Sequence, residues 1–158
     1  MAKLSIDPNF RDFLRYLNNH GVVYLVIGGY AVMHHGYVRT TGDLDVWIAT
    51  NPENAQRVAK AVQEFGFKEA TPDLFSRFGK MTRMGEIPVR IEILTDISGV
   101  TFDACYVDRV IADVHGILVP IISRKHLIAN KRASDRDKDR DDIKWLDRVL
   151  KAGKKRQK

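Results

Sequence analysis

The stretch VVYLVIGGYAVMHHGYVRTTGDLDVWI, residues 22–48, decides how this chain folds. Residues 22–27 are β-branched, aromatic or leucine side chains, a run that favours a buried strand. Gly28 and Gly29 follow, and because neither has a Cβ, the backbone can turn sharply there and approach a ligand closely. Residues 30–35 suit a short helix whose free amide groups point back to this turn, which favours a phosphate at that place.

A second strand, over residues 43–48, carries two acids. The alternation of a strand puts Asp43 and Asp45 on one face and apolar side chains on the other. Two ionised carboxylates side by side repel each other, and a divalent cation removes that repulsion. Magnesium prefers hard oxygen ligands, usually one or two carboxylates plus substrate phosphates. The alternative is a polar strand end with two solvated aspartates, and the glycine turn and the loop with Arg39 ahead of the strand favour the metal site.

The order of these motifs resembles that of the nucleotidyltransferase superfamily, which includes DNA polymerase β, the minimal nucleotidyltransferases and the AbiEii-type toxins. The closer similarity is to the small bacterial AbiEii and minimal nucleotidyltransferase proteins. The resemblance implies an α/β (α+β) fold, with a mixed, mostly antiparallel β-sheet flanked by helices and followed by C-terminal helices. It also implies Mg²⁺-dependent transfer of a nucleoside monophosphate from an NTP, with ATP among the candidates, to an acceptor hydroxyl. The matching residues are Gly28-Gly29, the short helix, His35-Gly36, Arg39, Thr41 and Asp43-Leu44-Asp45.

The superfamily has a third carboxylate, usually aspartate, on a later strand. Here Glu92 lies in the middle of the otherwise apolar strand 88–94, and burying it without a partner would be costly. Glu92 therefore either pairs with Arg90 or a nearby lysine, or joins Asp43 and Asp45 as a catalytic and metal-binding residue. Asp96, just after this strand, is the other candidate for the third carboxylate.

The resemblance assigns Gly28, Gly29, Arg39, Thr41 and Lys131 to nucleotide binding. Lys131 lies on a helix predicted over residues 124–133 with Ser123 as its cap, near the inner face of that helix. The family has a lysine on a helix after the sheet that contacts the NTP phosphates. A lysine exposed on the surface is the alternative interpretation.

Residues 134–142, SDRDKDRDD, form a dense run of mixed charge. Taken by itself, such a run indicates the solvated start of a helix. It also resembles the R-x-K-D-x-x-D run of the small nucleotidyltransferases. The matching side chains are Arg136, Lys138, Asp139 and Asp142.

Periodicity and turn residues predict the rest of the chain. In residues 70–79 we expect one helical turn lining the cleft, whose phenylalanines either stack on a nucleobase or pack under the loop. The other expected elements are a helix starting at Asp7-Pro8, a helix from about residue 52 to Gly66, strands 67–69, 81–84 and 88–94 with a turn at Gly85-Glu86, a helix over 102–108, a hairpin of 109–114 and 117–122, and a final helix over 143–150.

Composition sets the remaining expectations. With 158 residues, 44% of them hydrophobic and 29% charged, the chain is expected to form one nucleotidyltransferase-like domain over residues 1–150. Residues 151–158 form a basic tail, expected to be disordered, which can follow an RNA backbone or only keep the protein in solution. The single Cys105 excludes an internal disulfide. No segment is apolar enough to span a membrane or serve as a signal peptide, so we expect a cytoplasmic protein.

Three hypotheses about function follow. The first is an enzyme that transfers a nucleotide to RNA, including tRNA, to a protein or to a small molecule, and the net charge of +6 favours RNA. The second is a non-catalytic nucleotide-binding or RNA-binding module that acts as a partner protein, for example in a toxin–antitoxin pair. The third is a protein that binds a partner only through its charged C-terminal region. The sequence leaves the acceptor, the NTP and the oligomeric state, including a homo-oligomer, open.

Overall fold

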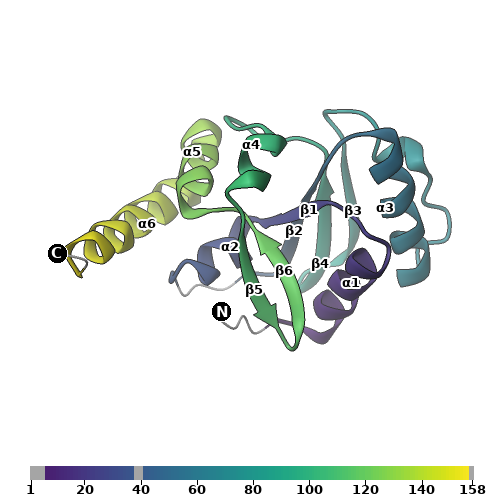
Figure 1. The fold of residues 1–158 in the computed structure, drawn as a ribbon, viewed down its shortest axis with the longest axis horizontal. Helices are drawn as coiled ribbons and strands as arrows, with labels where there is room; N and C mark the ends of the chain where they lie inside the picture. Colours follow the sequence, from purple (N-terminus) through teal and green to yellow (C-terminus); the bar gives the residue numbers. More distant parts are fainter. Residues whose placement is uncertain (1–5, 38–40, 157–158) are drawn as a thin grey trace.

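A six-stranded sheet with the strand order β3-β4-β2-β1-β6-β5 forms the centre of the structure, a computed structural model that describes residues 6–37 and 41–156 (Figure 1). The strands are β1 (Tyr24–Ile27), β2 (Asp43–Ile48), β3 (Met81–Glu86), β4 (Val89–Leu94), β5 (Val110–Val114) and β6 (Ile117–Ile121). The helices are α1 (Pro8–Asn19), α2 (Gly28–His34), α3 (Pro52–Phe65), the single turn η1 (Pro72–Leu74), α4 (Phe102–Val107), α5 (Arg124–Ser134) and α6 (Asp137–Arg156).

The pairing of the strands places β2 in the interior of the sheet. β2 runs antiparallel to β1 on one side and parallel to β4 on the other. β3 with β4 and β5 with β6 are antiparallel, while β1 and β6 are parallel. The mixed, mostly antiparallel sheet flanked by helices confirms the predicted fold class.

Two helices, α1 and α3, pack against each other beside the sheet (Figure 1). Each begins at a side-chain cap followed by proline: Asp7 accepts a hydrogen bond from the Asn9 amide, and Asn51 accepts one from the Asn54 amide. The contact between them includes Phe13 and Phe65, whose ring centroids lie 5.1 Å apart. The predicted apolar stripe of α1 is fully buried, namely Phe10, Phe13, Leu14 and Leu17.

Helices α5 and α6 lie away from this pair. In Figure 1, α5 and α6 extend to the left, whereas α1 and α3 lie on the right. Ser123 caps α5 as expected, since its hydroxyl accepts a hydrogen bond from the His126 amide. Among the described residues, no helix has the length and apolar character needed to cross a membrane.

One predicted strand is wrong. Residues 67–69 form a turn rather than a strand, and the Ala70 amide donates a hydrogen bond to the Phe67 carbonyl at 3.2 Å. Phe67 instead stacks against Phe65 at the end of α3, with ring centroids 6.3 Å apart. An apolar residue after the helix therefore serves packing and not strand pairing.

The turn between β3 and β4 is also displaced from its predicted place. It lies at Ile87-Pro88, because β3 continues to Glu86, which pairs with Val89. Gly85 lies inside the strand, opposite Arg90. Its φ is +76°, and a Cβ there would lie 2.4 Å from the Val89 carbonyl oxygen. Gly85 is thus required because the two strands approach each other closely there. The turn between the strands was predicted at this glycine.

The final helix is longer than predicted. α6 runs from Asp137 to Arg156, so it extends into the predicted basic tail, whose disorder stays a prediction. Lysine, alanine and arginine are good helix formers, and cations are favourable near a helix C-terminus. Residues 157–158 lie outside the described residues.

Candidate active site

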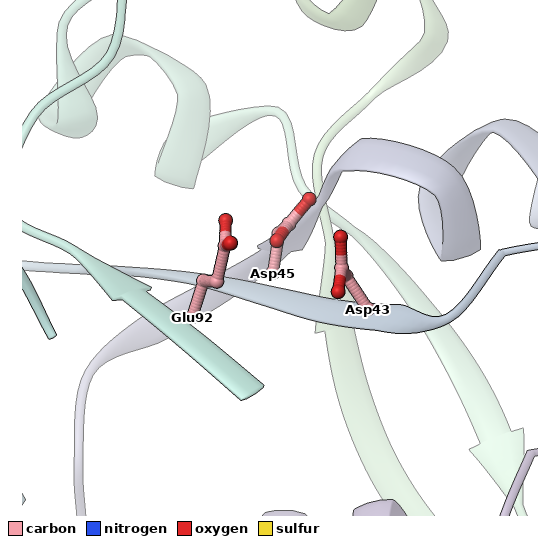
Figure 2. Close-up of side chains that lie close together, drawn as sticks. All are labelled: Asp43, Asp45 and Glu92. Atoms are coloured by element: carbon pink, nitrogen blue, oxygen red, sulfur yellow. The ribbon is translucent and has the colours of Figure 1, made fainter. Parts of the chain in front are cut away.

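Three carboxylates gather on one face of the sheet, and we call Asp43, Asp45 and Glu92 the carboxylate cluster. Parallel pairing of β2 with β4 puts Asp45 directly opposite Glu92. One oxygen from each side chain lies within 4.8 Å of the other two. Figure 2 shows the three side chains rising from neighbouring strands to the same side. Of the two candidates for the third carboxylate, Glu92 therefore lies beside Asp43 and Asp45, and Asp96 does not belong to the cluster.

Within the carboxylate cluster, the surroundings of Asp45 disfavour its negative charge. Burial, together with the negative charges of Glu92 and Asp43, raises the pKa of Asp45 to about 7. Its Oδ1 is buried and has no hydrogen-bond partner among the described residues. An unpaired buried carboxylate oxygen is costly. Three converging carboxylates are suitable ligands for a hard divalent cation. The donor set therefore fits Mg²⁺.

Two arginines partly neutralise the carboxylate cluster. Arg90 donates to both oxygens of Asp43, at 2.7 and 2.9 Å, and Arg83 donates from Nε to Glu92 Oε1 at 3.1 Å. Arg90 Nε is also 3.5 Å from Glu92 Oε1. The pairing of Glu92 with a cation, one of the two expectations, is thus present, with Arg83 as its closer partner. Sequence reasoning missed Arg83, which the antiparallel pairing of β3 with β4 places opposite Glu92.

The glycine turn lies directly against the carboxylate cluster. Gly28 begins α2 with a φ of +67°, and a Cβ on it would lie 2.2 Å from Asp45 Oδ2. A Cβ on Gly29 would lie 2.7 Å from Thr41 Oγ1. The two glycines are therefore required by the packing of Asp45 and Thr41, in addition to any ligand. The helix starts at Gly28, two residues before the predicted start at Tyr30.

Two further predicted nucleotide-binding residues precede β2. Thr41 borders the carboxylate cluster, and its Oγ1 accepts a hydrogen bond from the Asp43 amide at 3.4 Å. Arg39 lies in residues 38–40, outside the described residues.

Lys131 belongs to a second group of buried charges. Its Nζ lies 3.1 Å from Asp139 Oδ1 and 3.0 Å from Asp142 Oδ2, and the three side chains are at most 4% exposed. Ser134 and Arg136 also donate to Asp139 Oδ2, at 2.7 and 2.8 Å. We call these five residues the ion-pair cluster. It shows that residues 134–142 are not simply a solvated helix start, because Asp139 and Asp142 are buried.

The hydrogen bonds to Asp139 decide its charge. Burial pushes the pKa of Asp139 up, but hydrogen bonds from Arg136, Ser134 and Lys131 outweigh it and hold the pKa well below its usual value. Asp139 is therefore ionised at neutral pH. It fixes Lys131 on α5 and Arg136, just before α6, beside the carboxylate cluster.

A cavity of about 330 Å³ joins the two clusters. Gly28 and Gly29 line it together with the three carboxylates. It is also lined by five cationic side chains, namely Arg83, Arg90, Lys131, Arg136 and Lys138. The carboxylates, which can bind a metal ion, thus share one cavity with cationic side chains, which can bind phosphates. A metal-bound polyphosphate requires both kinds of group.

A second cavity, of about 280 Å³, adjoins the first. Gly28, Asp45 and Glu92 line both cavities. Asp96 lines only the second of these two, beyond the end of β4. The second cavity therefore leads away from the carboxylates along the sheet.

Comparison with protein families gives a match over nearly the whole chain. Residues 8–157 match the family described as nucleotidyl transferase of unknown function (DUF2204). The chain belongs to this family. Among curated proteins, none matches the chain.

Two solved structures share the fold of this nucleotidyltransferase family member. One is a putative nucleotidyltransferase, TM1012, from Thermotoga maritima: it is 19% identical, with a TM-score of 0.53, over 94% of this chain and 88% of that chain. The other is the lincosamide antibiotic adenylyltransferase LnuA with lincomycin bound: it is 14% identical, with a TM-score of 0.57, over 92% of this chain and 99% of that chain. The superfamily expected from the glycine turn and the Asp-x-Asp strand is thereby confirmed.

Proposed function

We propose that this protein is a Mg²⁺-dependent enzyme that transfers a nucleoside monophosphate from an NTP to an acceptor hydroxyl. One observation carries the proposal: a buried, unpaired oxygen of Asp45 lies within a group of three carboxylates, beside a cavity lined by cations. Asp43, Asp45 and Glu92 would hold the ion. When bound, Mg²⁺ supplies charge neutralisation for the phosphates of the NTP and for the developing transition state.

The protein's own groups orient the reactants. The acceptor oxygen forms a bond to the α-phosphorus, the bond from that phosphorus to the bridging oxygen breaks, and pyrophosphate leaves with the electron pair. Glu92 either completes the metal site or takes the proton of the acceptor hydroxyl. Arg83 donates a hydrogen bond to Glu92 Oε1 at 3.1 Å and so helps to hold the side chain in place for either role.

The cations of the cavity would bind the triphosphate. Arg83, Arg136 and Lys138 line the cavity that contains the carboxylate cluster, and the backbone of Gly28 and Gly29 borders it. Lys131 reaches the same cavity, but Asp139 and Asp142 hold its ammonium group. Arg83 and Arg136 also have carboxylate partners, but their side chains are 50% and 61% exposed, whereas that of Lys131 is 4% exposed. We therefore assign the direct phosphate contacts to Arg83, Arg136 and Lys138, and a mainly positioning role to Lys131.

The proposal is tested by a transfer assay. Purified protein is incubated with each α-labelled NTP and Mg²⁺, together with total RNA, protein or a small-molecule extract. ATP comes first and small molecules are included because LnuA is a lincosamide antibiotic adenylyltransferase. We expect label to enter one acceptor class, and both EDTA and Asp43→Asn to stop it. Asp73→Asn, an exposed change on η1, is the matched control and keeps the rate. Label transfer at the wild-type rate by Asp43→Asn would contradict the metal assignment.

A second function has one specific observation in its favour. Arg90 and Arg83 already pair with Asp43 and Glu92, so the cluster is partly neutral without a metal. A non-catalytic module of the same family, for example the partner protein of a toxin–antitoxin pair, would keep such pairs and bind nucleotide or RNA. Nucleotide binding that is equally tight in Mg²⁺ and EDTA, with no labelled product in any acceptor class, is the result that favours this module.

A further inference from the structure

A larger cavity, of about 710 Å³, continues from the site along the same sheet face. Asp96 and Ile97 line both this cavity and the smaller one that contains Asp45 and Glu92. Trp47 also lines it, and it follows Asp45 by two residues on β2, on the same face of the strand. The large cavity therefore adjoins the smaller one, which is lined by Asp45 and Glu92 of the carboxylate cluster.

The charge of the large cavity is opposite to that of the cation-lined cavity. Its ionisable lining residues are Asp96 and Asp103, and among the residues that the structure describes no lysine, arginine or histidine lines it. Both aspartates are exposed, and within the described part of the chain neither has an ion pair. Such a surface attracts a cation and repels a nucleic-acid backbone, although the chain as a whole is basic.

Aromatic side chains supply the rest of the recognition surface. Trp47 and Phe102 meet edge to face, with ring centroids 5.1 Å apart, and Phe78 is 71% exposed in the wall of the cavity. The Trp47 side chain is 2% exposed, yet its Nε1 has no hydrogen-bond acceptor in the described residues. A buried N–H without an acceptor is rare in folded proteins, and a ligand oxygen that enters the cavity wall as far as Nε1 would satisfy it.

We propose that this cavity binds the acceptor, and that the acceptor is a small molecule with a cationic amine, an apolar ring and a hydroxyl rather than RNA. The inference rests on the proposed function and specifies its acceptor. The amine lies near Asp96 and Asp103, and the ring lies against the aromatic side chains. The hydroxyl reaches Asp45 and Glu92 through the smaller cavity.

The positions of the cavities suit the chemistry. The triphosphate occupies the cation-lined cavity and the acceptor arrives from the acidic cavity, and an in-line transfer requires the attacking oxygen and the leaving pyrophosphate to lie on opposite sides of the α-phosphorus. The acceptor hydroxyl loses its proton to a carboxylate of the cluster, and its oxygen forms a phosphate ester. Pyrophosphate departs with the electron pair of the broken bond.

Binding of small probes tests this inference without Mg²⁺ or nucleotide, and so independently of whether transfer occurs. The probes are para-(aminomethyl)benzyl alcohol, the neutral para-methylbenzyl alcohol and the anionic para-(hydroxymethyl)benzoate. The chain has two tryptophans, so in a Trp145→Phe protein the single indole N–H signal of the proton–nitrogen spectrum belongs to Trp47. We expect the cationic probe to shift this signal, with an affinity in the millimolar range set by its size and ~10-fold tighter than the anionic probe.

Charge variants complete the test. Asp103→Asn should remove most of the preference for the cationic probe, because its carboxylate lines the cavity, whereas Asp73→Asn on η1 should leave the preference unchanged. Equal affinities for the three probes, or no shift of the Trp47 signal by any of them, would overturn the inference. So would adenosine that binds there and displaces the cationic probe, since the cavity would then hold the nucleoside of the NTP.

Discussion

The carboxylate cluster and the ion-pair cluster both bury charge, but only the ion-pair cluster balances it. In the ion-pair cluster, Asp139 and Asp142 face Lys131 and Arg136, and Asp139 accepts hydrogen bonds on both oxygens. In the carboxylate cluster, an oxygen of Asp45 is buried without a partner. The two clusters are neighbours, because Lys131 and Arg136 of the ion-pair cluster line the same cavity as the three carboxylates.

The comparison separates a structural role from a functional one. A buried charge that is fully paired and hydrogen-bonded holds elements in register, here α5 against α6. A buried acid next to two other acids does not stabilise the fold, and a chain retains such an arrangement for a ligand. We therefore expect substitutions in the carboxylate cluster to affect activity and those in the ion-pair cluster to affect stability.

The largest expected effect is the loss of transfer in Asp45→Asn. Removing this ligand should lower the transfer rate on the order of 10³-fold, because the ion then loses a central carboxylate. The melting temperature in EDTA should stay the same or rise, since the change removes a buried charge with an unpaired oxygen. Added Mg²⁺ should raise the melting temperature of the wild type but not of the variant. A variant that transfers at the parent rate would show that Asp45 holds no essential ion.

The next largest effect is on stability, in Asp139→Asn. This change leaves buried Lys131 with only Asp142 as its carboxylate partner, and we expect a loss of about 3 kcal/mol in the free energy of unfolding. The melting temperature should then fall by roughly 6–12 °C. Asp135→Asn is the matched control: its pair with Arg140 is solvent-exposed and screened by water, so we expect little or no loss of stability. Similar losses in both variants would mean that burial does not distinguish the two aspartates.

The two clusters also differ in how many of their residues could be predicted from the sequence. Asp43 and Asp45 were found because both lie on one strand, where alternation alone puts them on one face. Glu92 was found from a local conflict, an acid within an apolar strand. Arg83 was missed because its contact depends on the pairing of β3 with β4, which local periodicity does not specify.

The ion-pair cluster was harder to predict for the same reason. In residues 134–142, acids and bases alternate densely, which by itself indicates a solvated helix. Only the packing of α5 on α6 shows that Asp139 and Asp142 point inward to Lys131 while Asp135 stays exposed. The acidic cavity at Trp47 likewise depends on α4 and on the loop after β4, segments whose placement no motif encodes.

The pH dependence of stability should have opposite signs in the two clusters when metal is removed. The pKa of Asp45 is raised, so the stability that its protonation contributes is present below about pH 4 and lost as the pH rises to about 7. The pKa of Asp139 is lowered, so its contribution is present above about pH 4 and lost on acidification.

Urea unfolding in EDTA between about pH 3 and pH 8 measures both contributions. The advantage of Asp45→Asn over the wild type should grow by about 3 kcal/mol as the pH rises from about 4 to 7. The disadvantage of Asp139→Asn should shrink as the pH falls below about 4. If both differences change in the same direction with pH, the contrast between the two clusters is wrong.

The smallest expected effect comes from the glycine turn, which confines the carboxylate cluster from one side. Gly28 and Gly21 share a φ of +67°, so alanine at either position costs about 1 kcal/mol of backbone strain. A Cβ at Gly21 meets nothing within 4 Å, whereas at Gly28 it would lie 2.2 Å from Asp45 Oδ2. Gly28→Ala should therefore lose about 1 kcal/mol more than Gly21→Ala, and it should also weaken Mg²⁺ binding, because Asp45 has to move. Equal unfolding free energies and equal Mg²⁺ affinities in the two variants would mean that Asp45 has room to move without loss, and its unpaired oxygen would then need no ion to explain it.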